Sequence, residues 1–443
     1  MTTAHPVTPT LSFEPAHALI DVPRSIRLAH FSPHESVRIR ASLTRADGTL
    51  WQSHAHFTAG PDGSLDLDDA VPAEGSSYRH ASASGLIWSL ELVRGSETPR
   101  GDEAIDSRTI EFEATSASGA RATATLVQQL VADGVSRTEI RAEGLVGTLF
   151  QPAGSGPHPV VIVLNGSGGG INEARAALLA AHGFAAFALG YFQAPGRPDH
   201  ISATPLEYFA TAIAWSRMNL APAHGFVALL GQSRGAELAL LLGATYGSAV
   251  SAVVGYVPSS VVHGTLRAGR PGEHPASPAW TLGGQRLATV WDDNRTADWA
   301  AFNSTVSPVR QAPSFVSALR DTDAVERSRI RVENITGPVL LLSGTDDGFW
   351  PSSTMADGIV ERMHAARHPY PVAHLKYEGA GHSIHFPFVP TTRIVKPHAV
   401  AKVDLSAGGT PEANARANEE SWPKVVEFLR AAVAAGTRDG EVR

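Results

Sequence analysis

The strongest chemical signal in the sequence is a serine flanked by small residues, in the segment Gly231-Gln232-Ser233-Arg234-Gly235. The apolar stretch 226–230 before it is expected to be a strand, and residues 236–242 after it are expected to be a helix. A sharp strand-to-helix turn needs small neighbours, because its central residue is strained and crowded. Such a turn raises the serine hydroxyl above the end of a sheet, so we interpret Ser233 as a nucleophile. A serine in an ordinary turn is the alternative.

A serine nucleophile at neutral pH needs a base, and the base needs an acid to orient it. The apolar stretch 339–342 leads into the loop Gly344-Thr345-Asp346-Asp347-Gly348-Phe349-Trp350-Pro351. Asp347 lies three residues after Gly344 and four residues before Pro351, and this spacing along the sequence favours it as the acid of this loop. Asp346 is the alternative acid. A further alternative is that both aspartates are solvated turn residues without a catalytic role.

The base is expected in the loop after the stretch 372–378, where Gly379-Ala380-Gly381 precedes His382. Small residues before a histidine allow the loop to bring the imidazole back over a sheet. His385 follows three residues later, so a metal pair is conceivable, but no third ligand of matching spacing is nearby. We therefore predict His382 as a general base and no metal or other cofactor.

Acyl transfer at a serine also requires hydrogen-bond donors for the oxyanion that forms on the carbonyl. One donor is expected to be the backbone N–H of Arg234, the residue after the nucleophile. The others are expected from Ser167 and Gly168 in the glycine-rich loop 166–170. A phosphate cradle is the alternative for this loop, but the loop matches neither of the common phosphate-binding glycine motifs.

The elements that position these residues alternate between apolar strands and helices from about residue 140 onward. Strands are expected at 145–150, 160–164, 184–189, 226–230, 250–257, 339–342 and 372–378, and helices near 173–182, 206–216, 236–242 and 411–434. This alternation predicts an α/β domain with a mostly parallel sheet that is covered on both faces. The segment 260–329 is irregular and is expected to be an insertion, such as a cap over the site.

The first third of the chain has the pattern of β structure instead. Residues 37–43 alternate between apolar and polar, Asp47-Gly48 forms a turn, and residues 50–58 are expected to return as a hairpin. Further strands are expected at 86–93, 109–115 and 123–130. We predict a flexible segment at 1–15, an immunoglobulin-like β-sandwich at 16–135, a catalytic domain at 136–437 and a tail at 438–443.

Composition excludes several classes of function. The chain has no cysteine, so it has no thiolate nucleophile and no iron–sulfur cluster. Its net charge of -7, without a run of basic residues, argues against nucleic acid as a partner. The apolar stretch 176–192 contains His182 and Gly183, which favours a buried helix and strand over a membrane span. With no secretion signal at its start, the protein is expected to be cytoplasmic.

These residues together resemble the family of acyl-CoA thioesterases and bile acid-CoA:amino acid N-acyltransferases, over nearly the whole chain. Besides the serine, acid and histidine loops, the similar segments are Gly147-Thr148-Leu149-Phe150-Gln151-Pro152, Gly168-Gly169-Gly170, His182-Gly183-Phe184, Leu206-Glu207-Tyr208-Phe209 and residues 417–428. The resemblance implies an α/β-hydrolase fold after the β-sandwich. It also implies a catalytic triad of Ser233, Asp347 and His382.

The resemblance further implies hydrolysis of an acyl-CoA, which is then the small-molecule partner. The N-acyltransferase branch has a cysteine nucleophile, and a serine ester is less prone to aminolysis, so hydrolysis is favoured over transfer to an amino acid. A carboxylesterase or lactone hydrolase of the same fold, and an inactive scaffold, are the alternatives. Arginines in plausible loops for the coenzyme A phosphates are Arg94, Arg197, Arg267 and Arg270. The ending Glu441-Val442-Arg443 differs from a peroxisomal Ser-Lys-Leu signal.

Overall fold

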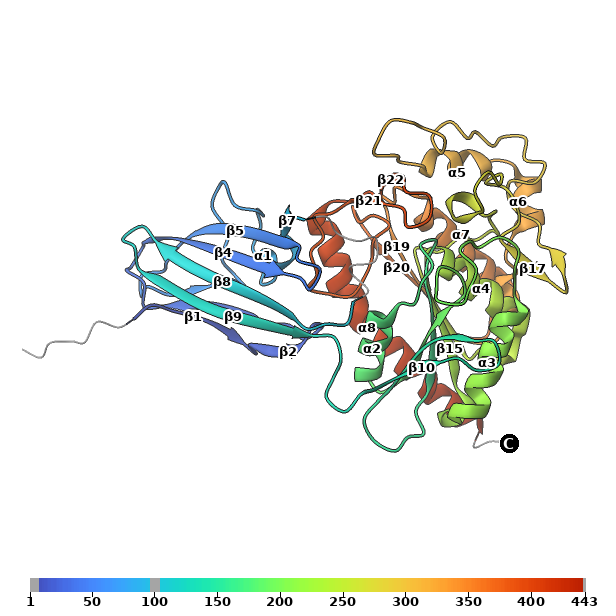
Figure 1. Cartoon of the computed structure of the whole chain (residues 1–443), viewed down its shortest axis with the longest axis horizontal. Coiled ribbons are helices and arrows are strands. Elements are labelled where there is room, and N and C mark those ends of the chain that lie inside the picture. The colour runs from blue at the N-terminus through green and yellow to red at the C-terminus, as the bar shows by residue number, and fades with distance from the viewer. Residues whose placement is uncertain (1–7, 96–103, 441–443) are drawn as a thin grey trace, which may run out of the picture. The chain divides into compact units, whose positions relative to one another are not determined.

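The structure, a computed structural model, describes residues 8–95 and 104–440 and contains two compact units (Figure 1). Of the described residues, 8–95, 105–130 and 386–393 form the first unit, and 104, 131–385 and 394–440 form the second. Within the described residues, no helix combines the length and the apolar character that crossing a membrane requires.

The first unit consists of two β-sheets. A sheet of six strands has the order β2-β9-β8-β4-β5-β7, and a sheet of three strands has the order β1-β3-β6. The aromatic rings of Phe13 and Phe112, one from each sheet, lie 4.7 Å apart in the core between them. The strands are β1 (Thr10–Glu14), β2 (His17–Leu19), β3 (Ser25–Ala29), β4 (Ser36–Thr44), β5 (Leu50–Thr58), β6 (Leu65–Asp66), β7 (Glu91–Arg94), β8 (Arg108–Ser116) and β9 (Arg121–Gln129).

The predicted hairpin is confirmed, because β4 and β5 pair in antiparallel register from Ser36 opposite Thr58 to Thr44 opposite Leu50. Alternate residues of both strands are buried. The alternation of apolar and polar residues in the sequence therefore identifies the side chains on the face that packs on the core.

Three expectations for the first unit differ from the structure. Residues 10–14, expected to be flexible, form β1, because Leu11 and Phe13 are buried on alternate positions. The strand expected at 86–93 begins as a short helix, α1 (Gly85–Trp88), whose residues are all buried, and only then becomes β7. Residues 386–393, which our boundaries place in the catalytic domain, bond to this unit; for example, Thr391 N–H donates to Trp88 O.

The second unit is built on a sheet of eight strands with the order β10-β11-β13-β12-β15-β16-β19-β20. The first two strand pairs are antiparallel and the remaining five are parallel. The strands are β10 (Ser136–Ile140), β11 (Val146–Gln151), β12 (Val160–Leu164), β13 (Ala185–Gly190), β15 (Val227–Gln232), β16 (Ala252–Tyr256), β19 (Val339–Gly344) and β20 (Val372–Tyr377).

Every residue of β12, β13, β16 and β19 is buried, as continuous apolar strands between covering layers require. The larger helices are α2 (Glu173–Ala181), α3 (Glu207–Leu220), α4 (Arg234–Tyr246), α7 (Ser352–Ala365) and α8 (Pro411–Gly440). The last of these continues through Pro423 into the expected tail at 438–443 and ends at Gly440. The sheet and helices agree with the predicted α/β-hydrolase domain, and β10 is an edge strand that the sequence pattern did not indicate.

The strand directions explain where the chemical residues meet. Because β12, β15, β16, β19 and β20 are parallel, the loops that follow them lie at one edge of the sheet. The glycine-rich loop follows β12, Ser233 follows β15, Asp347 follows β19 and His382 follows β20.

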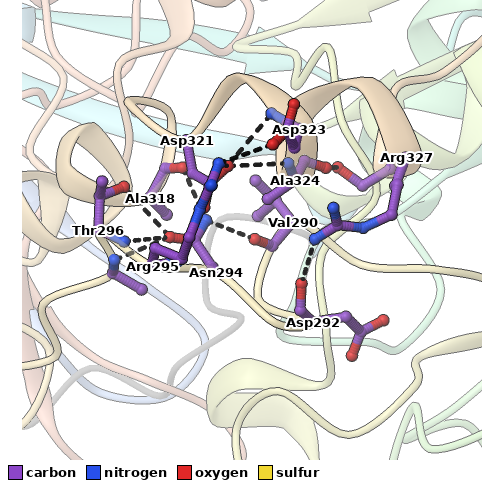
Figure 2. A network of polar contacts seen from close by, with 12 residues as sticks. Val290, Asp292, Asn294, Arg295, Thr296, Ala318, Asp321, Asp323, Ala324 and Arg327 are labelled. Carbon is purple, nitrogen blue, oxygen red and sulfur yellow. Dashed lines mark hydrogen bonds and ion pairs between the residues drawn. The ribbon is translucent and has the colours of Figure 1, made fainter.

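The insertion at 260–329 is ordered by an apolar core that it shares with Trp350 and Met355, and by a polar network (Figure 2). Arg295 donates to the carboxylate of Asp321 through its backbone N–H (2.8 Å) and through its guanidinium (2.9 Å), and Asp321 caps α6 (Thr322–Ser328). These hydrogen bonds hold the pKa of the Asp321 carboxyl well below its usual range. Besides several 3-10 helices, the other small elements of the second unit are β14 (Thr204–Pro205), β17 (Trp280–Leu282), β18 (Gln285–Arg286), α5 (Ala312–Ala318), β21 (Val395–Pro397) and β22 (Asp404–Ser406).

Candidate active site

Ser233 lies between β15 and α4 in a strained backbone conformation, with φ 56° and ψ −119°. The two flanking glycines are required by space. A Cβ on Gly231 would lie 1.9 Å from the carbonyl oxygen of Gly235, and a Cβ on Gly235 would lie 2.3 Å from that of Leu164. A strained residue between two crowded glycines is the geometry that exposes a nucleophile at a strand-to-helix turn.

The imidazole of His382 lies against the Ser233 hydroxyl, with 2.8 Å between Nε2 and Oγ. The side chain is buried, and the ring of Phe349 stacks on it with 4.4 Å between ring centroids. Small residues before the histidine are needed, because a Cβ on Gly381 would lie 2.2 Å from Gly408 O.

His385, the second histidine of this loop, donates its backbone N–H to Asn418. No group of three metal-ligating side chains occurs among the described residues.

The structure brings Asp347, and not Asp346, to His382. Both carboxylate oxygens of Asp347 lie 2.9 Å from Nδ1 of His382, and the Asp347 side chain is 1% exposed. A carboxylate can only accept here, so Nδ1 carries the imidazole proton and Nε2 is free to accept the proton of Ser233.

Further donors hold the Asp347 carboxylate in place. Oδ1 accepts the N–H groups of Phe349 (2.9 Å) and Trp350 (3.3 Å), and Oδ2 accepts the hydroxyl of Ser352 (2.6 Å). The sequence reasoning assigned no role to Phe349 or Ser352. The position of Ser352 directly after Pro351, at the start of α7, is the local signal that it missed.

Asp346 points to a different partner at the surface. Its side chain is 48% exposed and pairs with the guanidinium of Arg310, and its Oδ2 accepts the N–H of Gly409 at 2.8 Å. Burial raises the pKa of the Asp346 carboxyl, but the bonds from Arg310 and Gly409 outweigh it and bring the pKa below its usual value.

The glycine-rich loop lies beside Ser233, since a Cβ on Gly166 would be 3.4 Å from Cβ of Ser233. The N–H groups of Gly166, Gly169 and Gly170 all donate to neighbouring protein oxygens. In contrast, the N–H groups of Ser167 and Arg234 have no acceptor among the described residues. Gly168, the third expected donor, packs near Ala399.

A small cavity of about 20 Å³ adjoins Ser233 and Ser167. The insertion contributes Leu266, Arg267 and Gln311 to its wall, and the hairpin formed by β21 and β22 contributes His398. Sequence reasoning missed Gln311 and His398, because neither has a neighbour in the chain whose spacing marks a site.

The four candidate arginines have different surroundings. Arg267 lines the cavity, donates from Nε to Gln311 (2.9 Å) and stacks on the ring of Phe302. Arg197 stacks on Tyr208, Arg270 is exposed, and Arg94 belongs to the first unit. Of the three candidates in the second unit, only Arg267 lines the cavity beside Ser233.

The side chain of Arg234 is buried and structural. Its guanidinium donates to both carboxylate oxygens of Glu237, at 2.9 and 2.8 Å, and to Gly264 O at 2.6 Å. Glu237 also accepts from Trp280 Nε1 (2.9 Å) and from the N–H of His263 (3.2 Å). The pair therefore ties α4 to the start of the insertion.

We expect Arg234→Met to destabilise the protein by about 3–5 kcal/mol, because it leaves the Glu237 carboxylate buried without its cation. Urea denaturation followed by circular dichroism measures the loss. The double variant Arg234→Met/Glu237→Gln is the matched control, since glutamine still accepts from Trp280 but carries no charge, and it should recover much of the stability. An unchanged unfolding midpoint in the single variant would contradict this account.

Comparisons with known proteins identify the family of this chain. The family model described as "BAAT / Acyl-CoA thioester hydrolase C terminal" matches residues 204–435, and the model of the "Acyl-CoA thioester hydrolase/BAAT N-terminal region" matches residues 21–142. Human acyl-coenzyme A thioesterase 1 is 31% identical over 95% of this chain and 96% of its own length. Mouse acyl-coenzyme A thioesterase 5 is 29% identical over 96% of each chain, and mouse peroxisomal succinyl-coenzyme A thioesterase is 29% identical over 95% of this chain and 96% of its own. The chain belongs to the acyl-CoA thioester hydrolase/BAAT family.

Proposed function

We propose that this protein hydrolyses acyl-CoA thioesters through a serine acyl-enzyme, with Ser233 as nucleophile, His382 as base and Asp347 as the acid that orients the base. The observation that carries the proposal is the continuous chain of hydrogen bonds from the Ser233 hydroxyl through His382 to Asp347. The relatives named as acyl-coenzyme A thioesterases support the choice of substrate.

In the first half of the reaction, His382 takes the proton of Ser233 while the serine oxygen attacks the thioester carbonyl. The oxyanion accepts hydrogen bonds from the N–H groups of Arg234 and Ser167. When the carbon–sulfur bond breaks, coenzyme A leaves as a thiolate, because a thiol with a pKa of about 8.5 needs little help from an acid. The thiolate then takes the proton from His382, which becomes a neutral base again.

In the second half, His382 removes a proton from water, and the water oxygen attacks the acyl-serine. When the bond between the acyl carbon and the serine oxygen breaks, His382 returns this proton to Ser233, and the carboxylic acid is released. The mechanism uses no metal or organic cofactor, and coenzyme A enters only as part of the substrate. The oxygen ester of the intermediate is less prone to aminolysis than a thioester, which favours water over an amino acid as the acceptor.

The proposal is tested by thiol release from short-, medium- and long-chain acyl-CoAs, read with a thiol-reactive dye. The enzyme has no cysteine and gives no background of its own. We expect release from at least one acyl-CoA, and no amide product when glycine or taurine is added.

Two outcomes would contradict the proposal. Cleavage of aryl esters without release from any acyl-CoA would identify a carboxylesterase, and formation of an acylated amino acid would identify a transferase. The cytoplasmic location remains a prediction, because the relatives include proteins named as mitochondrial and peroxisomal.

A further inference from the structure

A histidine outside the proposed triad lies in the wall of the cavity beside Ser233. His398 follows β21, and its side chain is largely buried, with 8% of the residue exposed. Its Nε2 lies 3.0 Å from the hydroxyl oxygen of Ser167, which lines the same cavity. The mechanism described above uses the backbone N–H of Ser167 but gives no role to either of these two side chains.

The surroundings of His398 fix which of its nitrogens carries the proton. Nδ1 accepts the backbone N–H groups of Val400 (3.2 Å) and Ala401 (3.1 Å), so Nδ1 has no hydrogen. In a neutral imidazole the hydrogen is then on Nε2, which donates to Ser167. Burial, with the nearby charges of Arg267 and Lys402, lowers the pKa of His398 to about 4, so the ring is neutral at physiological pH.

The hydroxyl of Ser167 is thereby oriented. Its oxygen accepts from His398, so its own hydrogen must point to another acceptor, and no protein acceptor for it occurs among the described residues. The cavity that Ser167 shares with Ser233 has room for about one water-sized group. A carbonyl oxygen that becomes negative beside Ser233 fits this space in size and in charge.

We propose that the hydroxyl of Ser167 donates a third hydrogen bond to the oxyanion, and that His398 is a positioning residue that holds this hydroxyl in the donating orientation. The proposal rests on the acyl transfer at Ser233 proposed above. It adds a side-chain donor to the two backbone donors, and it explains why a buried, neutral histidine lies at the site.

The test compares Ser167→Ala with the wild-type enzyme on an acyl-CoA and on an aryl ester. Losing one oxyanion donor typically lowers turnover by about 10²- to 10³-fold, so kcat should fall by at least about 10²-fold with KM changed less than about threefold. His398→Ala should lower kcat about tenfold in the wild-type background. It should have no further effect in the Ser167→Ala background, because the two residues act as a unit.

A matched control comes from another serine–histidine pair of the same unit. The Ser343 hydroxyl lies 2.6 Å from Nε2 of His374 and does not line the cavity. Ser343→Ala also deletes a buried hydroxyl bonded to histidine, and it should leave kcat within about threefold. Circular dichroism checks that each variant is folded.

Binding separates a catalytic role from a structural one. An aryl boronic acid forms a tetrahedral adduct with a serine and places an oxygen in the oxyanion site, whereas a thioether analogue of acyl-CoA has no such oxygen. Ser167→Ala should weaken binding of the boronic acid at least about tenfold and leave binding of the thioether unchanged. Equal weakening of both ligands, or a kcat within about threefold of wild type, would overturn the proposal. The aryl ester keeps the test valid if the protein proves to be an esterase rather than a thioesterase.

Discussion

Replacing Ser233 with alanine is expected to lower kcat for acyl-CoA hydrolysis by at least about 10⁴-fold, because serine, histidine and acid act as one unit. The substitution removes the serine oxygen, which is the atom that forms the acyl-enzyme in the proposed mechanism. Thiol release under saturating substrate measures the effect.

The fold should survive this substitution. The Ser233 side chain makes no capping hydrogen bond to α4, and alanine is no larger than serine, so the turn loses only the bond to His382. Circular dichroism and the unfolding midpoint should therefore match the wild-type protein. Normal activity in a folded Ser233→Ala variant would show that the reaction occurs elsewhere and would remove the basis of the proposed function.

Replacing Asp347 with asparagine is expected to lower kcat by about 10⁴-fold. The carboxylate accepts from His382 Nδ1, from two backbone N–H groups and from the hydroxyl of Ser352, so both of its oxygens are in use as acceptors. An asparagine amide offers one oxygen and a nitrogen that donates. The amide group would place a donor against His382 or Ser352 and would favour the imidazole tautomer that cannot take the serine proton.

Asp346→Asn is the matched control, since it makes the same change one residue away. Its carboxylate bonds to Arg310 and to Gly409, and neither contact reaches His382. We expect kcat within about threefold of wild type and a modest effect on stability, as for other half-exposed ion pairs. A large loss in Asp346→Asn together with an active Asp347→Asn would reverse the assignment of the acid.

The fold was largely predictable, because its signals are local. Continuous apolar stretches of five or six residues mark β12, β13 and β15, and alternation over nine residues marks β4 and β5. The parallel arrangement follows from the helices between those strands. One error, at α1, occurs where burial does not follow a simple period, because all four of its residues are buried.

The sequence by itself determined which loops carry Ser233, His382 and the two aspartates, for which we propose the roles of nucleophile, base and acid. Gly231, Gly235 and Gly381 are crowded by backbone within a few ångströms, and this crowding permits only glycine at positions one or two residues from Ser233 and His382. A constraint of that kind can be recognised in the sequence, because it fixes the amino acids near the site residue. Spacing alone still left Asp346 and Asp347 as alternatives, because adjacent residues share every such constraint.

Only the tertiary structure decided which aspartate faces His382 and which distant side chains complete the cavity. Gln311 comes from an insertion with no regular period, and His398 from a hairpin that meets the loop at Ser167 across 231 residues of chain. Such contacts depend on how separate elements pack, and packing depends on the combined shape of many side chains. The physical reason is that a strained turn limits which amino acids can stand near it in the sequence. A contact between distant segments does not limit the amino acids that flank either residue.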